Sequence, residues 1–204
     1  MGEKEVLFVL LDRFADWEAA SLAAALNELS PGRVKTIAPA REPVSSIGGF
    51  RVLPDYGFAA YNGEFDALIL IGGNSWRKEI AKEVLPLVQK AVEDQAVLGA
   101  ICDATVFLGM NGFLNEAAHT SNMLSDLKAA AGGRYTGQDR YQLRPAVRDD
   151  TLITANGTAF LEFGREVLLA LKAAPVEEIE EWYREFKLGY YGAREAGQQR
   201  QDLP

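Results

Sequence analysis

The chain of 204 residues contains one cysteine and one histidine. A single cysteine, Cys102, excludes a disulfide within the chain, and no Cys and His residues recur at the spacing of a zinc site. We therefore expect neither a metal nor another cofactor. The thiol of Cys102 is then a structural group, a reactive group or both.

Long apolar runs and clusters of positive charge are missing as well. The N-terminal stretch VLFVLL runs into Asp12 and Arg13 after only six residues, whereas a membrane helix needs roughly 18. The net charge of −8 and the pI near 4.8 argue against a surface that binds nucleic acid. We expect a cytoplasmic protein without a nucleic-acid or membrane partner.

Apolar runs of strand length alternate with helical patterns along most of the chain. Strand-like runs lie at 5–11, 65–73 and 96–101, and helix-like spacing covers 15–30, 79–95 and 158–174. Residues 44–55 read as a glycine-turned hairpin, and 145–157 as two short strands around an Asp-Asp turn. This alternation predicts an α/β fold, in which helices cover both faces of a mostly parallel sheet.

No repeat or linker divides the chain, so we expect a single domain over residues 1–190. Residues 175–190 form its predicted C-terminal helix, whose apolar residues share one face. We expect this face to pack against the domain or a second subunit rather than to act as a lid. Residues 191–204 have little apolar surface and are expected to form a mobile tail.

The cysteine lies in LGAICDATVFLG, residues 98–109, where a strand pattern changes into a helix pattern. A nucleophile on a strand-to-helix elbow needs small residues two positions before and after it, and Ala100 and Ala104 meet this requirement. The start of a helix also favours thiolate over thiol. The alternative is a buried cysteine that packs as a small apolar side chain.

Three other stretches should lie beside this elbow, because each follows a predicted strand. Parallel strands end at the same edge of a sheet, where α/β proteins bind their substrates. Glycines after a strand can aim backbone N–H groups at an oxyanion, and acidic residues there can serve as helix caps or as site residues. The candidates are Asp16 and Glu18 in FADWE, Gly72, Gly73 and Asn74 in ILIGGNSW, and Asn156, Gly157 and Thr158 in ITANGTAFLEFG.

The ordered set DWE, IGGN, AICDAT and TANGTAFLEF resembles the DJ-1/PfpI superfamily, which has the class I glutamine-amidotransferase-like fold, from about residue 4 to 172. The resemblance implies a flavodoxin-like three-layer sandwich, commonly homodimeric. It also implies that Cys102 is the nucleophile and Glu18 the carboxyl group beside it. The backbone N–H groups of Gly73 and Asp103 would form the oxyanion hole.

The chain departs from the resemblance in its histidines. PfpI-type peptidases have histidine directly after the nucleophile, where this chain has Asp103. The late His-x-Glu of glutamine amidotransferases is replaced by residues 160–162, FLE, so glutamine hydrolysis is not expected. The histidine that many DJ-1-like proteins have after the elbow helix corresponds to Asn122. His119, three residues earlier, is either a group that reaches the sulfur or a surface or capping histidine.

Glu18 is therefore the expected partner of Cys102. We expect the two groups to share one proton, with a protonated Glu18 donating to the thiolate. Such a site suits a small electrophile, such as a 2-oxoaldehyde, in a reaction of glyoxalase or deglycase type. The alternatives are an oxidative-stress sensor or chaperone that uses the same thiol, and an intracellular cysteine peptidase. The charge of Asp103 should discourage anionic substrates unless its side chain points away along the helix.

Overall fold

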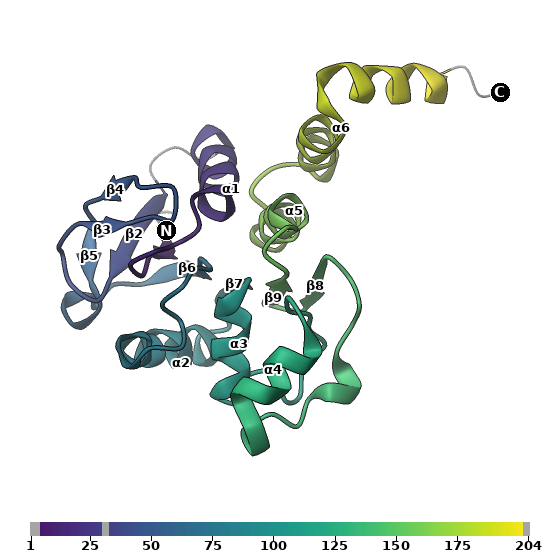
Figure 1. The fold of residues 1–204 in the computed structure, drawn as a ribbon. Helices are drawn as coiled ribbons and strands as arrows, with labels where there is room; N and C mark the ends of the chain where they lie inside the picture. Colours follow the sequence, from purple (N-terminus) through teal and green to yellow (C-terminus); the bar gives the residue numbers. More distant parts are fainter. Residues whose placement is uncertain (1–4, 30–32, 202–204) are drawn as a thin grey trace.

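The computed structural model describes residues 5–29 and 33–201. Its main sheet has seven strands in the order β5-β2-β1-β6-β7-β9-β8 (Figure 1). These are β5 (Tyr56–Gly57), β2 (Val34–Ala38), β1 (Glu5–Val9), β6 (Phe65–Leu70), β7 (Val97–Ile101), β9 (Leu152–Ala155) and β8 (Ala146–Asp149). All neighbours are parallel except β8 and β9. β3 (Val44–Ser45) and β4 (Arg51–Val52) form the predicted hairpin.

Six α-helices in the described part of the chain pack around these strands. They are α1 (Asp16–Leu29), α2 (Leu85–Glu93), α3 (Asp103–Met110), α4 (Leu124–Ala131), α5 (Phe160–Leu171) and α6 (Val176–Gln201). Residues 79–84, predicted as the start of an α-helix, form a 3₁₀ helix, and Pro86 stands in the first turn of α2. Proline has no N–H to donate to the carbonyl four residues earlier, so the α-helix cannot extend from α2 into residues 79–84. No helix within the described ranges is both long and apolar enough to cross a membrane.

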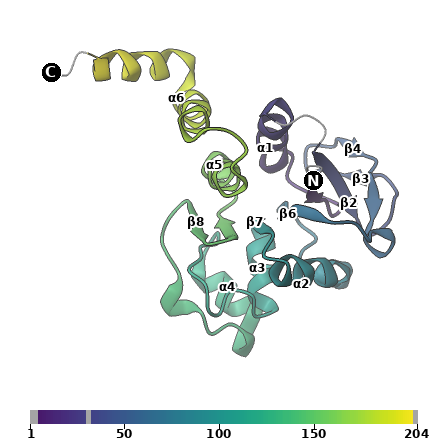
Figure 2. The ribbon, with the colours of Figure 1, turned by 180° about the vertical axis from the view of Figure 1, so that it is seen from behind.

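Two apolar cores lie on opposite faces of the sheet. Successive residues of a strand point to opposite sides, so Leu7 and Leu68 face one core and Phe8 and Ile69 the other. The first core is closed by α2, α3 and α4, and the second by α1, α5 and the start of α6. Figures 1 and 2 show these helix groups on the two sides of the sheet. The predicted three-layer α/β sandwich is thereby confirmed.

Helix α6 is longer than predicted. It continues to Gln201 and so includes most of the segment expected to be a tail, because Ala, Glu, Gln and Arg are good helix formers. At Gly189, with φ 73° and ψ 160°, the helix bends, and its second part turns away from the body (Figure 2). Ile179 is buried in the second core, so the first part packs on the domain as expected. The homodimer stays a prediction.

Candidate active site

The carboxyl ends of β1, β6, β7 and β9, four adjacent strands, bring the candidate segments together. The strand order reverses at β1, since β2 lies on one side of it and β6 on the other. A cleft of about 600 Å³ opens at this edge, and it is lined by Trp17, Glu18, Cys102, Asn122, Asn156, Gly157 and Thr158. Within the described part of the chain, no cluster of acidic, His or Cys side chains is arranged to hold a metal.

Cys102 stands on a sharp turn between β7 and α3. Its backbone has φ 60° and ψ −129°, a region that non-glycine residues rarely adopt. The turn is held by the Cys102 N–H, which donates to the Ala155 carbonyl at 3.0 Å, and by the Thr105 hydroxyl, which donates to the Cys102 carbonyl at 2.6 Å. Ala100 and Ala104 are fully buried on either side, so larger residues would force the strand and helix apart. The thiol is half-buried and opens onto the cleft.

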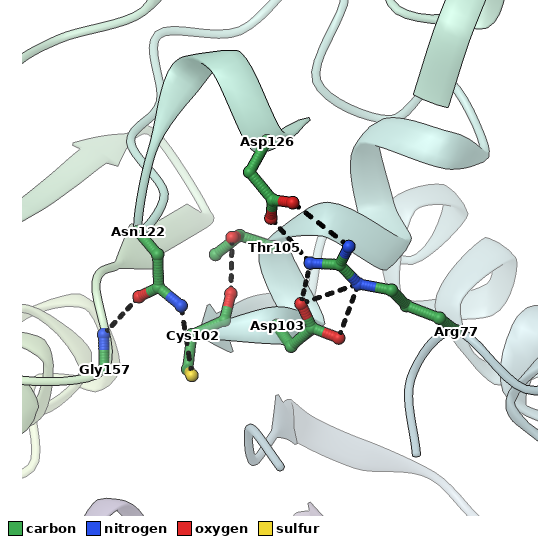
Figure 3. A network of polar contacts seen from close by, with 7 residues as sticks. All are labelled: Arg77, Cys102, Asp103, Thr105, Asn122, Asp126 and Gly157. Atoms are coloured by element: carbon green, nitrogen blue, oxygen red, sulfur yellow. Dashed lines mark hydrogen bonds and ion pairs between the residues drawn. The ribbon is translucent and has the colours of Figure 1, made fainter. Parts of the chain in front are cut away.

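Two N–H donors surround the sulfur. The Asn122 amide donates from Nδ2 to Sγ at 3.3 Å, while its Oδ1 accepts the Gly157 N–H at 2.8 Å (Figure 3). The backbone N–H of Asp103 also donates to the sulfur. Asn122 thus joins the elbow to the loop after β9.

Glu18 approaches the sulfur from the first turn of α1. The carboxyl group is fully buried, and its Oε2 accepts the Gly72 N–H at 2.8 Å. Its Oε1 has no partner among the described residues. A Cβ on Gly157 would lie 2.9 Å from Sγ and 3.0 Å from Oε1, so both atoms face the small space that this glycine leaves. A Cβ on Gly72 would lie 2.5 Å from the Cβ of Cys102, so glycine is required there too.

Each group of this pair opposes the charge of the other. Burial raises the pKa of Glu18 to about 7, against the hydrogen bonds from Gly72 and Cys102. Burial and the Glu18 charge raise the pKa of Cys102 to about 11, against the donors Asn122 and Asp103. The pair therefore holds one proton and one negative charge between these two pKa values. The position of Cys102 at the start of α3 predicted a lowered thiol pKa. Beside an ionised Glu18 this lowering is not seen, because burial and the Glu18 charge outweigh it.

Gly73 and Asn74 differ in their availability to a substrate. Gly73 has φ 148°, and its N–H has no acceptor among the residues the structure describes. Neither Gly73 nor Asp103 is among the residues that line the cleft, so the oxyanion hole that their N–H groups would form stays a prediction. The Asn74 N–H instead donates to the Arg13 carbonyl at 3.1 Å, and its side chain is exposed outside the cleft lining. Asn74 therefore does not belong to the candidate site.

His119 does not reach the sulfur, so its prediction as a catalytic residue is wrong. It is fully buried, with Nδ1 at 2.8 Å from the Ala117 carbonyl and Nε2 at 2.7 Å from the Tyr135 hydroxyl. Burial lowers its pKa, so the ring is a neutral structural group, neither exposed nor a cap. The Thr120 N–H donates to Thr154 Oγ1 at 2.9 Å. This contact fixes the segment after His119 to β9, and Asn122 in that segment lies at the cleft.

The Asp103 carboxylate points away from the sulfur (Figure 3). It pairs with Arg77, whose Nη2 lies 2.5 Å from Asp103 Oδ1 and 2.6 Å from Asp126 Oδ2. Sequence reasoning missed Arg77, because nothing in its local pattern links positions 77, 103 and 126. It also missed Trp17, which lines the cleft and donates from Nε1 to the Gly157 carbonyl at 3.1 Å.

Comparisons with known proteins show the family and the fold of the chain. The chain belongs to the DJ-1/PfpI family, whose model matches residues 4–170. A relative in Bacillus subtilis, the uncharacterized protease YdeA, is 37% identical over an alignment of 197 residues that covers 92% of this chain and 93% of the relative. The crystal structure of the thiJ/pfpI family protein from Bacillus anthracis has a TM-score of 0.85 and 34% identity, with 92% of each chain covered. The DJ-1 superfamily protein Atu0886 from Agrobacterium tumefaciens has a TM-score of 0.79 and 36% identity, with 88% of this chain and 95% of that chain covered.

Proposed function

We propose that the protein is an enzyme that converts small, uncharged carbonyl compounds of the 2-oxoaldehyde type, with Cys102 as nucleophile and Glu18 as proton carrier. One observation supports this most. The unpartnered Oε1 of a fully buried Glu18 and the sulfur of a strained elbow face the same space at the cleft. A nucleophile and a proton carrier within reach of one reacting atom are what covalent catalysis requires.

The shared proton belongs on Glu18 rather than on the sulfur. An ionised Glu18 would bury a carboxylate whose Oε1 has only the weakly donating thiol of Cys102 as a partner, which is costly. A protonated Oε1 instead becomes a donor to the sulfur, so the thiolate has three: Glu18, Asn122 and the Asp103 N–H. The thiolate also lies at the start of α3, where the helix dipole favours negative charge.

The first step forms a bond between the sulfur and the aldehyde carbon. The electrons of the C=O double bond move to oxygen, where the N–H groups of Gly73 and Asp103 stabilise the charge. This oxygen then takes the proton of Glu18. The product is a neutral hemithioacetal beside an ionised carboxylate.

The carboxylate then rearranges the hemithioacetal. Glu18 removes the proton from the former aldehyde carbon to leave an enediolate, and returns it to the neighbouring carbon. The hydroxyl proton on the first carbon passes to the second oxygen, which leaves a thioester. Water adds to the thioester and the bond to sulfur breaks. The net reaction joins one 2-oxoaldehyde and one water into one 2-hydroxy acid, and no oxidant or reductant is needed.

The lining of the cleft favours a small, uncharged substrate. Apart from the Cys102 and Glu18 pair, its described lining residues are Trp17, two asparagines, Gly157 and Thr158, none of which carries a charge. Arg77 holds the Asp103 carboxylate and offsets part of its charge, since the guanidinium is shared with Asp126. The second N–H of each asparagine amide can donate to carbonyl oxygens of the substrate, whereas the Thr158 hydroxyl already donates to Asn156 Oδ1 at 2.7 Å.

A cysteine peptidase is the second candidate, because the relative in Bacillus subtilis is described as an uncharacterized protease. Peptide cleavage requires an acid that protonates the leaving amine. No histidine lines the described part of the cleft, so Glu18 would have to supply this proton as well. The neighbours Asn122 and Asp103 cannot act in the way a histidine would.

The test measures hydroxy-acid formation from methylglyoxal and cleavage of a fluorogenic peptide library by the same preparations. Wild type should convert methylglyoxal, and Cys102→Ala and Glu18→Gln should not. Glu28→Gln, on the exposed side of α1, is the matched control and should retain the wild-type rate. Turnover that survives in Cys102→Ala would refute the nucleophile. Peptide cleavage alone would favour the peptidase, and rapid peroxide oxidation without any turnover would favour a redox sensor.

A further inference from the structure

We propose that Arg77 is a positioning residue for Cys102, which holds the Asp103 carboxylate away from the sulfur and offsets its charge. The inference rests on the proposed role of Cys102 as a nucleophile. It assigns a function to a side chain that lies outside the cleft lining and touches no reacting atom.

The contact between Arg77 and Asp103 is extensive. Nε lies 3.0 Å from each carboxylate oxygen of Asp103, and Nη2 lies 2.5 Å from Oδ1. Such a fork of N–H donors fixes the direction of a carboxylate as well as neutralising it. Figure 3 shows the result, with the carboxylate and the sulfur on opposite sides of the elbow.

Asp126 anchors the guanidinium from the other side. Its oxygens accept Nη1 at 3.1 Å and Nη2 at 2.6 Å, from the first turn of α4. Arg77 follows Gly73 by four residues, and Asp126 follows Asn122 by four. One guanidinium therefore connects the three segments that provide the Gly73 N–H, the Asp103 N–H and the Asn122 amide to the reacting centre.

Three carboxylates and one guanidinium determine the charge around Cys102. Glu18 faces it from α1, Asp103 follows it at the start of α3, and Asp126 lies at the start of α4. Arg77 is the cation that contacts these last two carboxylates. Without Arg77, the Asp103 carboxylate would be unpaired and free to turn toward the sulfur. A second negative charge would then oppose the thiolate.

The test follows alkylation of Cys102 by iodoacetamide, an uncharged reagent, as a function of pH. We compare wild type with Arg77→Met, Arg77→Lys and the double variant Arg77→Met/Asp103→Asn. The matched control is Arg165→Met, since Arg165 also bridges two carboxylates, Glu166 and Glu180, at a distance from the cleft. Thermal unfolding of each variant shows whether it is folded at the assay temperature.

Arg77→Met should alkylate about threefold more slowly at pH 6, with the midpoint of its pH profile about one unit higher, after the greater nucleophilicity of a thiolate of higher pKa is taken into account. Removing the Asp103 charge in the double variant should restore most of the rate, and Arg77→Lys should retain most of it. A wild-type profile in Arg77→Met would overturn the proposal. So would an equal loss in Arg165→Met, or a double variant that stays as slow as Arg77→Met. Alkylation needs no turnover, so an absence of methylglyoxal conversion would refute the proposed function and leave this test intact.

Discussion

Replacing Glu18 by leucine tests the shared proton directly. Leucine fills a similar volume but can neither carry charge nor donate to the sulfur. In wild type the pKa of Glu18 is raised to about 7 and that of Cys102 to about 11, so the pair loses its first proton near pH 7. The proposed mechanism places the resulting negative charge on the sulfur. In Glu18→Leu only the thiol can titrate. Because the sulfur remains half-buried, its pKa should stay at or above the ordinary value of 9.0.

The size of the effect follows from these values. Below pH 7 a two-unit difference in pKa changes the thiolate fraction by about 100-fold. A thiolate of lower pKa is the weaker nucleophile, which offsets this difference by about eightfold. We therefore expect Glu18→Leu to alkylate about tenfold more slowly than wild type at pH 6.5. The midpoint of its rate profile should lie near pH 9 or above, compared with about pH 7 in wild type.

The assay measures pseudo-first-order alkylation by iodoacetamide from pH 5.5 to 10, with mass spectrometry of the single cysteine. Glu28→Leu, at an exposed position of α1, controls for the change of residue type in this helix. Glu18→Gln retains an N–H donor without a charge and should fall between wild type and Glu18→Leu. If Glu18→Leu alkylates as fast as wild type at pH 6.5, or faster, Glu18 does not stabilise the thiolate and the mechanism must be rejected.

Two further predictions concern the same pair. Folding raises the pKa of Glu18 from 4.5 to about 7. Between these two pH values the folded protein still holds a proton that the unfolded chain has lost, so the free energy of unfolding falls as pH rises through this range. Urea unfolding should show that the stability of Glu18→Gln relative to wild type increases by about 2–3 kcal/mol between pH 5 and pH 8; an equal difference at both pH values would contradict the shift. Gly157→Ala should slow alkylation of Cys102 by about tenfold or more, since its Cβ would lie 2.9 Å from Sγ and 3.0 Å from Glu18 Oε1. Gly133→Ala, where a Cβ meets nothing within 4 Å, is the control and should react as wild type, whereas equal rates in both variants would show that the space at Gly157 is not needed.

Local pattern was enough to predict the layers and the elbow. Strand-length apolar runs and helical spacing predicted the main strands and helices, because burial on a sheet or a helix face imposes a fixed period on the residues. Ala100 and Ala104 marked the elbow because a close approach of strand and helix excludes larger side chains on either side of Cys102. The position after β1 gave Asp16 and Glu18 as candidates, since the parallel strands end at one edge of the sheet, and the resemblance to the family selected Glu18.

The choice between His119 and Asn122 depended on tertiary structure. They lie three residues apart, and both types of side chain can bond to a thiolate. Packing of His119 between Tyr135 and Tyr141 buries the ring and leaves Asn122 at the sulfur. The order of residues in a loop does not show which of them faces the core.

The sequence by itself determined which residue types could supply a nucleophile, a carboxyl group and backbone donors, because the period and small residues that place them are local. Only the tertiary structure decided their partners. Arg77 reaches Asp103 across 26 positions and Asp126 across 49, and Glu18 meets the Gly72 N–H across 54. Contacts over such separations arise from the packing of helices against the sheet. For that reason the charge balance of Cys102 could be derived only from the folded chain.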